Sequence, residues 1–162
     1  GVTIANAGTA TGFGEANTPA FAVQGTDEQS SVASATYTKV TFNSELKDTD
    51  SAFDLSTERF TVPSGKAGRY YFHATTASDF SGVGDDGERA LLYAYKNGSG
   101  VIFNDFFIGS SYNVVQVSNS FSWILDLSAG DYVELFIYNK DGNASGNAIV
   151  SDGSIFFGYR LV

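Results

Sequence analysis

Short apolar runs alternate with turn signals along almost the whole chain after Pro19. The runs are rich in Val, Ile, Phe, Tyr and Thr, and clusters of Gly, Asn, Asp and Ser separate them. No segment sustains a 3.6-residue period, and only residues 50–60 are ambiguous. Many short strands with regular turns predict an antiparallel β sandwich or barrel. We expect strands over 37–42, 69–76, 90–96, 101–108, 113–117, 120–127, 131–138 and 154–161.

Alternation within two of these strands predicts which side chains face the core. Each strand has one strongly apolar face, formed by Phe121, Trp123, Leu125 and Leu127 in the first and by Val133, Leu135 and Ile137 in the second. Because successive side chains of a strand point to opposite sides, these faces define the interior of the sandwich. We therefore place Trp123, the only tryptophan of the chain, in the core.

The opposite faces of two strands are unusually aromatic. Tyr71 and His73 lie opposite Tyr70 and Phe72, and the strand at 132–138 has a second face of the same kind. A sandwich buries one face of each sheet, so contiguous outer aromatic side chains need cover from elsewhere. Tyrosine suits a half-wet interface, although scattered surface aromatics are the alternative. We expect a homo-oligomer whose interface includes Tyr71, His73, Tyr132, Phe136 and Tyr138.

Length and composition indicate one folded domain. The chain has 162 residues, of which 43% are hydrophobic and 15% aromatic, enough to bury a real core. Residues 1–18 are rich in Gly, Ala and Thr and are typical of a linker or an extended arm. We assign residues 19–162 to the domain itself. We interpret a chain that begins at Gly1 as a fragment or processed product of something longer.

Charge and residue inventory exclude several classes of function. The formal net charge of −9 repels phosphate backbones and anionic membranes, so nucleic acid is not an expected partner. The sequence contains no run of about 18 apolar residues, so we expect no membrane-spanning segment. The absence of cysteine excludes disulfides and thiolate sites, and one histidine makes a zinc site implausible.

The candidates for site chemistry are few. His73 lies in mid-strand among aromatic residues without a G-x-S-x-G motif, so we expect no enzyme and no cofactor. Asp85, Asp86 and Glu88 could offer oxygen ligands to Ca²⁺ from a Gly-rich loop, but the D-x-D-x-D-G spacing is absent and solvated turn residues are the alternative. Residues 82–87 match G-x-G-x-x-G by letter, yet they open no predicted helix and do not support nucleotide binding.

An ordered set of short motifs covers most of residues 19–162. The pattern F-x5-[ND]-x4-[FYWL]-x6-F, followed by G-x-Y-x-F, is matched by Phe42, Asp48, Phe53, Phe60, Gly68, Tyr70 and Phe72. Further pieces follow the expected order: "PAFAV" (19–23), "AYKNG" (94–98), "LSAGDYVEL" (127–135) and "FFGYRL" (156–161). Together these motifs resemble the C1q-like domain of the C1q/TNF jelly-roll superfamily.

Three departures accompany this resemblance. The spacer between Phe60 and Gly68 is two residues longer than usual, Ala74 replaces an aromatic residue, and Arg160 replaces a common leucine. The longer turn and the absence of cysteines are more similar to bacterial and phage versions of the domain. The resemblance implies an all-β, antiparallel, ten-strand jelly-roll sandwich that forms a compact homotrimer, with outer-face aromatic residues near the threefold axis.

Two classes of function follow from a trimeric jelly roll. The first is a recognition knob of a longer fibre protein, such as a phage tail or head fibre on a virion surface, that binds a host-surface glycan or protein. A secreted bacterial or invertebrate C1q-like lectin is the extracellular alternative, and the second class is a purely structural trimerisation or capping domain. Since the strands serve core and trimer, recognition falls on loops, and we expect receptor contacts at Tyr112, Asp85, Asp86 and Asn143.

Overall fold

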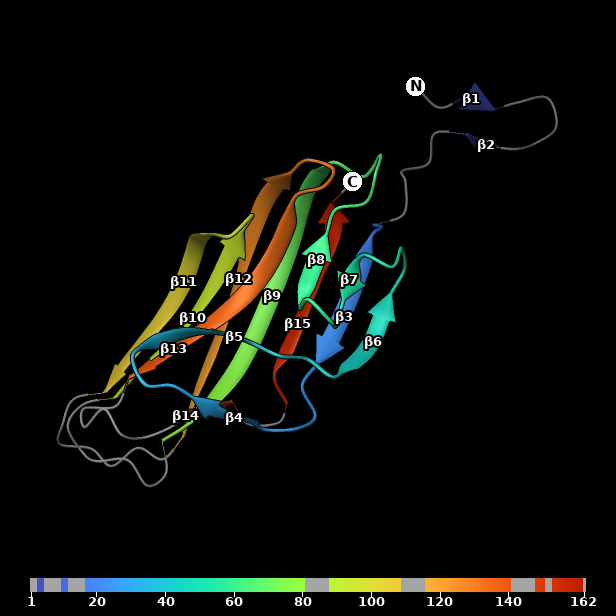
Figure 1. Cartoon of the computed structure of the whole chain (residues 1–162). Coiled ribbons are helices and arrows are strands. Elements are labelled where there is room, and N and C mark those ends of the chain that lie inside the picture. Colours follow the sequence, from blue (N-terminus) through green and yellow to red (C-terminus); the bar gives the residue numbers. More distant parts are fainter. Residues whose placement is uncertain are drawn as a thin grey trace.

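All regular elements that the structure describes are β strands. The computed structural model describes residues 3–4, 10–11, 17–80, 88–108, 116–140, 148–150 and 153–161 (Figure 1). No helix in these ranges has the length and apolar character to cross a bilayer. The strands are β1 (Thr3–Ile4), β2 (Ala10–Thr11), β3 (Ala20–Gln24), β4 (Gln29–Val32), β5 (Thr36–Lys39), β6 (Ser44–Asp48), β7 (Phe53–Asp54), β8 (Arg59–Thr61), β9 (Gly68–Asp79), β10 (Glu88–Lys96), β11 (Ser99–Ile108), β12 (Gln116–Leu127), β13 (Tyr132–Lys140), β14 (Ala148–Val150) and β15 (Ile155–Leu161).

Two antiparallel sheets form the body of the molecule. The first has six strands in the order β11-β10-β13-β8-β7, with β5 also paired to β13. The second has seven strands in the order β4-β14-β9-β15-β3-β6, with β12 also paired to β9. We call them the β13 sheet and the β9 sheet; Figure 1 shows them stacked as the two layers of a sandwich. The expected all-β antiparallel class is confirmed.

The strand segments outnumber the ten strands that were expected. The difference arises because β4, β7, β8 and β14 are pieces of only two to four residues. The runs at 113–117 and 120–127, expected as separate strands, contribute to one long strand, β12 (Gln116–Leu127). β1 and β2 form a small sheet of their own, and β3 begins at Ala20. The division of the chain at residues 18 and 19 stays a prediction.

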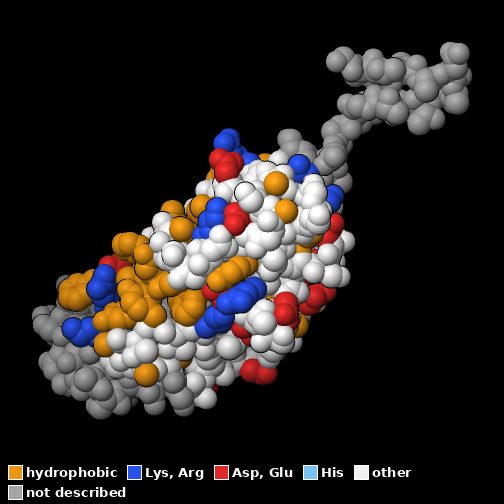
Figure 2. All heavy atoms as spheres, turned by 45° about the horizontal axis from the view of Figure 1, so that its top comes forward, with side chains coloured by type: hydrophobic (Ala, Val, Ile, Leu, Met, Phe, Trp, Pro, Cys, Tyr) orange, Lys and Arg blue, Asp and Glu red, His pale blue; other side chains and the backbone are white. Residues whose placement is uncertain are grey.

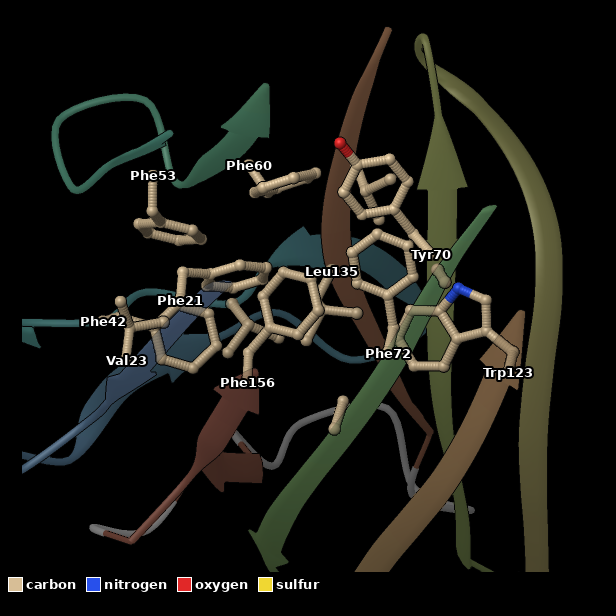
Figure 3. Close-up of a cluster of buried hydrophobic side chains, with 14 of the residues drawn as sticks. Phe21, Val23, Phe42, Phe53, Phe60, Tyr70, Phe72, Trp123, Leu135 and Phe156 are labelled. Carbon is tan, nitrogen blue, oxygen red and sulfur yellow. The ribbon is translucent and has the colours of Figure 1, made fainter. Parts of the chain in front are cut away.

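The core lies between the two sheets and is largely aromatic (Figure 3). Phe21 stacks on Phe60 with ring centroids 4.7 Å apart, and Phe72 stacks on Trp123 at 5.4 Å. Alternation placed the core side chains correctly: the buried set includes Trp123, Leu127, Val133, Leu135 and Ile137. Phe121 and Leu125 are only partly buried, because β12 pairs with β9 alone within the described residues and so lies at the border of its sheet.

The aspartate of the sequence motif organises the turn between β6 and β7. Asp48 Oδ1 accepts hydrogen bonds from the backbone N–H groups of Asp50 (3.2 Å) and Ala52 (3.0 Å). Its Oδ2 accepts a third from the N–H of Phe53 at 2.8 Å. Ala52 and Phe53 are buried, so their N–H groups have no easy access to water. The motif therefore requires Asp or Asn at this position to satisfy buried backbone donors.

We expect Asp48→Ala to lower the free energy of unfolding by about 2 kcal/mol, because it leaves buried N–H groups without acceptors. Asp48→Asn retains one side-chain oxygen and is expected to lose less. Urea denaturation followed by far-UV circular dichroism measures both variants. An Asp48→Ala variant with wild-type stability would show that the N–H groups find other acceptors.

The motifs at 94–98 and 127–135, which are distant in sequence, meet at the start of β13. Asp131 accepts hydrogen bonds from Asn97 Nδ2 (2.8 Å) and from the backbone N–H of Ser128 (2.9 Å), and it pairs with Lys96. Hydrogen bonds from these groups, that of Asn97 first, lower the pKa of Asp131 to about 2. Gly130, in the turn before β13, has a left-handed conformation with φ of +86°, which glycine adopts without strain. The β10–β11 hairpin and the start of β13 are thereby held together.

Candidate interaction surfaces

The five predicted interface residues lie on two opposite surfaces of the sandwich. Tyr71 and His73 are on the outer face of the β9 sheet, because the alternate residues of β9 are buried in the core. Tyr132, Phe136 and Tyr138 are on the outer face of the β13 sheet for the same reason. All five side chains are partly buried. They therefore form two separate patches, one on each sheet.

On the β9 sheet, Tyr71 and His73 belong to a mixed aromatic and polar cluster. The hydroxyl of Tyr71 donates to Ser122 Oγ at 2.9 Å, and His73 Nδ1 lies 2.9 Å from the same oxygen. The rings of Tyr71 and Tyr159 are 5.3 Å apart, and those of His73 and Phe157 are 5.0 Å apart. Ile124, beside Tyr71 on β12, is 54% exposed. We call this surface the β9 face.

The contact between His73 and Ser122 does not build a hydrolytic centre. A serine nucleophile needs a base that a third group orients. Within the described residues, His73 has a hydrogen bond only to Ser122, and no carboxylate holds its second ring nitrogen. Tyr71 donates to the same serine oxygen, which occupies a lone pair of the would-be nucleophile. The cluster has the chemistry of a contact surface.

On the β13 sheet, the predicted interface residues already have cover from their own chain. The guanidinium of Arg59 lies 4.2 Å from the ring centre of Tyr132. The ring centroids of Phe136 and Tyr95 are 4.3 Å apart, and Lys39 Nζ lies 5.7 Å from the ring centre of Phe136. A cation is attracted to the face of an aromatic ring, so Arg59 and Lys39 cover part of the ring surface of Tyr132 and Phe136. These rings therefore need less cover from a second subunit than alternation alone indicated.

A buried carboxylate anchors those cations. Glu134, on β13, is 2% exposed, and its Oε1 accepts hydrogen bonds from Lys39 Nζ and from Arg59 Nε at 2.7 Å. Burial opposes ionisation of Glu134, but the hydrogen bonds from Lys39 and Arg59 outweigh it and hold its pKa below the ordinary value. A buried charge needs such partners. Sequence reasoning missed this group, whose partners lie 95 and 75 residues away.

Among the described residues, the largest apolar exposure is on β11, which the sequence did not single out. In the described part of the chain β11 pairs only with β10, so it is the outermost strand of the β13 sheet. Figure 2 shows hydrophobic side chains gathered on this side of the molecule. Phe107 is 70% exposed, and residues on both sides of the strand are uncovered. We call this surface the β11 edge: Val101, Ile102, Phe103, Phe106 and Phe107.

The predicted receptor and calcium residues are not placed by the structure. Asp85, Asp86, Tyr112 and Asn143 lie outside the described residues. Glu88 begins β10, but its side chain is likewise outside the description. In the part of the chain that is described, no group of three or more His, Asp or Glu side chains is arranged to hold a metal ion. The receptor residues and the calcium site stay predictions.

Folding strongly disturbs the ionisation of Glu58, which interacts electrostatically with Lys39. Its Oε2 accepts a hydrogen bond from the backbone N–H of Phe42 at 3.0 Å. Burial nevertheless raises the pKa of Glu58 from 4.5 to about 7. Between these pH values the unfolded chain releases the proton while the folded chain retains it. Folding stability is therefore expected to fall as the pH rises from 4.5 to about 7.

We expect Glu58→Gln to flatten this pH dependence, because it keeps an acceptor for Phe42 and removes the titration. Since the carboxyl is partly exposed and screened by solvent, the variant should gain about 1 kcal/mol over wild type at about pH 8, and nothing at about pH 4. Urea denaturation at both pH values measures the difference, with the exposed Glu45→Gln as control. Parallel pH profiles for Glu58→Gln and wild type would contradict the assignment.

Two solved structures share the arrangement of the sandwich. The globular domain of zebrafish complement 1qA protein matches with a TM-score of 0.61 and 25% identity, over 89% of this chain and 97% of that chain. Murine APRIL, whose crystal structure was determined at pH 5.0, matches with a TM-score of 0.59 and 10% identity, over 88% and 98%. No protein-family model and no curated protein sequence matches the chain. The chain has the C1q/TNF-like jelly-roll fold.

Proposed function

We propose that this domain is a homotrimeric recognition module, without catalytic activity, that presents a binding surface at the end of a longer extracellular protein. The observation that carries the proposal is the β11 edge. An outer strand with one unpaired edge and with exposed apolar side chains on both sides is a liability for a monomer. Its burial against another copy removes that liability, so the domain supports self-association.

The second half of the proposed interface is the β9 face. Its rings at Tyr71, Tyr159 and Phe157 and its exposed Ile124 offer apolar contact, and the pair of surfaces differs in residue composition. A contact between two different patches is heterologous and closes into a ring when the rotation allows it. Three copies joined in this way form the trimer. A role for Tyr132, Phe136 and Tyr138 in the same interface stays a prediction.

The biological setting that fits this architecture is a fibre knob, as in a phage tail or head fibre on a virion surface, attaching to a host-surface glycan or protein. Three copies held together multiply weak single-site binding through avidity. A secreted lectin would use the same surfaces outside a virion. A purely structural trimerisation or capping domain is the second candidate, supported by the same β11 edge but without a ligand.

Two measurements test the proposal. Light scattering coupled to size exclusion should give three times the protomer mass of 17.2 kDa at micromolar concentration. Labelled trimer should also bind intact host cells. A mass of 17.2 kDa would contradict the trimer, whereas a trimer that binds no cell would favour the purely structural role.

A further inference from the structure

A cluster of tyrosines lies on the outer face of the β13 sheet, beside the β11 edge but chemically different from it. The ring of Tyr37 lies 6.0 Å from that of Tyr93 and 5.0 Å from that of Tyr138. Strand register fixes this grouping: Tyr138 is directly opposite Tyr37, and Tyr93 is opposite Phe136, the next residue on the same face of β13. We call Tyr37, Tyr93 and Tyr138 the tyrosine platform.

The platform combines ring surface with uncommitted polar groups. Tyr37 is 47% exposed, and Tyr93 and Tyr138 are partly exposed. Within the described residues none of the three hydroxyls has a hydrogen-bond partner, whereas the outer-face Tyr71 of the other sheet donates to Ser122. Each hydroxyl can both donate and accept. A ligand on the platform therefore meets apolar faces and free hydroxyls side by side.

A charged pair completes the rim of the platform. Arg89 makes a two-pronged contact with Asp105, with Nε to Oδ1 at 2.9 Å and Nη2 to Oδ2 at 2.7 Å. The guanidinium carbon lies 5.9 Å from the ring centre of Tyr138. Both side chains of the pair remain partly exposed. Fixed in this way, they can offer further hydrogen bonds without a change of conformation.

The charges around the platform favour a neutral ligand. Arg89, whose guanidinium lies against Tyr138, is paired with Asp105. Lys39 and Arg59 share the one carboxylate of Glu134 and keep one net positive charge, but their cationic groups lie over Phe136 and Tyr132, which are not platform residues. A sialylated glycan or a phosphate group on the platform would meet a paired cation at Arg89, and the net charge of −9 of the chain would repel it. A neutral ligand avoids both penalties.

We propose that the tyrosine platform binds a neutral oligosaccharide, which names the ligand class and the site of the proposed recognition function and rests on it. The negative face of an aromatic ring attracts the C–H groups on the flat side of a pyranose ring. The tyrosine hydroxyls, Arg89 and Asp105 can form hydrogen bonds with the hydroxyl groups at the edge of the sugar ring. The rings are inclined by 45° and 55° to one another, so successive sugar units would stack on separate rings.

The platform is less suited to a protein partner or a second copy than the β11 edge. Interface centres are depleted of charged residues. The apolar side chains of the β11 edge carry no hydroxyls, although the edge borders the platform: the rings of Phe103 and Tyr93 have centroids 5.2 Å apart, and Asp105 itself lies on β11. The platform instead has polar atoms at each ring edge and ion pairs at its border. In this proposal the β11 edge forms the contact between copies, and the tyrosine platform binds the oligosaccharide.

The test uses the full chain on a printed array of neutral and sialylated glycans. We expect wild-type trimer to bind neutral glycans. Tyr37→Ala and Tyr93→Ala should each weaken that binding about tenfold, through loss of one ring contact. Tyr37→Phe keeps the ring and removes the hydroxyl, so its loss should be smaller. Leu46→Ala, at an exposed apolar residue on β6, is the matched control and should bind as wild type.

Light scattering also measures the mass of each variant. The recognition function and the sugar site on the tyrosine platform can then be contradicted independently of each other. Wild-type trimer that binds host cells but no neutral glycan leaves the recognition function intact and overturns the platform. Preference for sialylated glycans, or unchanged binding by both alanine variants, overturns it too. If Tyr37→Ala or Tyr93→Ala is monomeric while wild type is trimeric, this face joins copies and is not the sugar site.

Discussion

Replacing Trp123 with alanine is expected to lower the free energy of unfolding by ~3–5 kcal/mol. The indole is 5% exposed and lies in a layer of rings, 4.6 Å from Phe121, 5.4 Å from Phe72 and 6.1 Å from Phe156. Alanine would remove the contacts of the largest side chain in this layer and leave a cavity. The neighbouring rings Phe72 and Phe156 are on β9 and β15, two strands that are hydrogen-bonded to each other. The backbone pairing holds these rings in place, so they cannot easily move into the cavity.

Trp123→Phe provides the matched control. It keeps one stacked ring and removes an indole N–H that, although buried, donates to no group of the described chain. The lost volume and the removed unsatisfied donor act in opposite directions, so we expect a loss below about 1.5 kcal/mol. Far-UV circular dichroism in urea measures all three proteins. A wild-type fluorescence maximum typical of water-exposed indole would contradict the placement of Trp123.

The fold could be predicted because its signals are local. Period-two alternation identified the core side of β12 and β13, and turn residues such as Gly130 marked where strands end. The role of Asp48 was only implied by the motif, since its three backbone partners depend on the shape of the β6–β7 turn. Motif order and strand pattern together were enough for the jelly roll.

The candidate surfaces were harder to predict because they depend on neighbours in space. Alternation shows that Tyr132 and Phe136 point outward, but not that Arg59 and Lys39, from two other strands, lie over their rings. The sequence "VIFNDFFI" indicates a strand over 101–108. Only its position beyond β10, at the border of the sheet, exposes apolar side chains on both sides. Strand order is a tertiary property, and local pattern does not contain it.

Phe107→Asp is expected to convert the trimer into folded monomers. Phe107 is 70% exposed in the single chain, so aspartate there is solvated and should leave the protomer stable. In the proposed interface the same carboxylate would be taken out of water beside Arg89, which lies directly opposite but is already paired with Asp105, so its burial is expected to cost several kcal/mol. Each 1.4 kcal/mol weakens association tenfold. At micromolar concentration, light scattering should therefore report 17.2 kDa instead of three times that mass.

Leu46→Asp separates an effect of the β11 edge from a general effect of surface charge. Leu46 is 56% exposed on β6, at the border of the other sheet, and the substitution adds the same charge to another exposed apolar site. We expect it to remain trimeric and to melt at the same temperature as wild type. Dissociation by Leu46→Asp but not by Phe107→Asp would move the interface to the β6 border. A trimer that survives both substitutions would remove the β11 edge from the interface, and with it the main support for the proposed assembly.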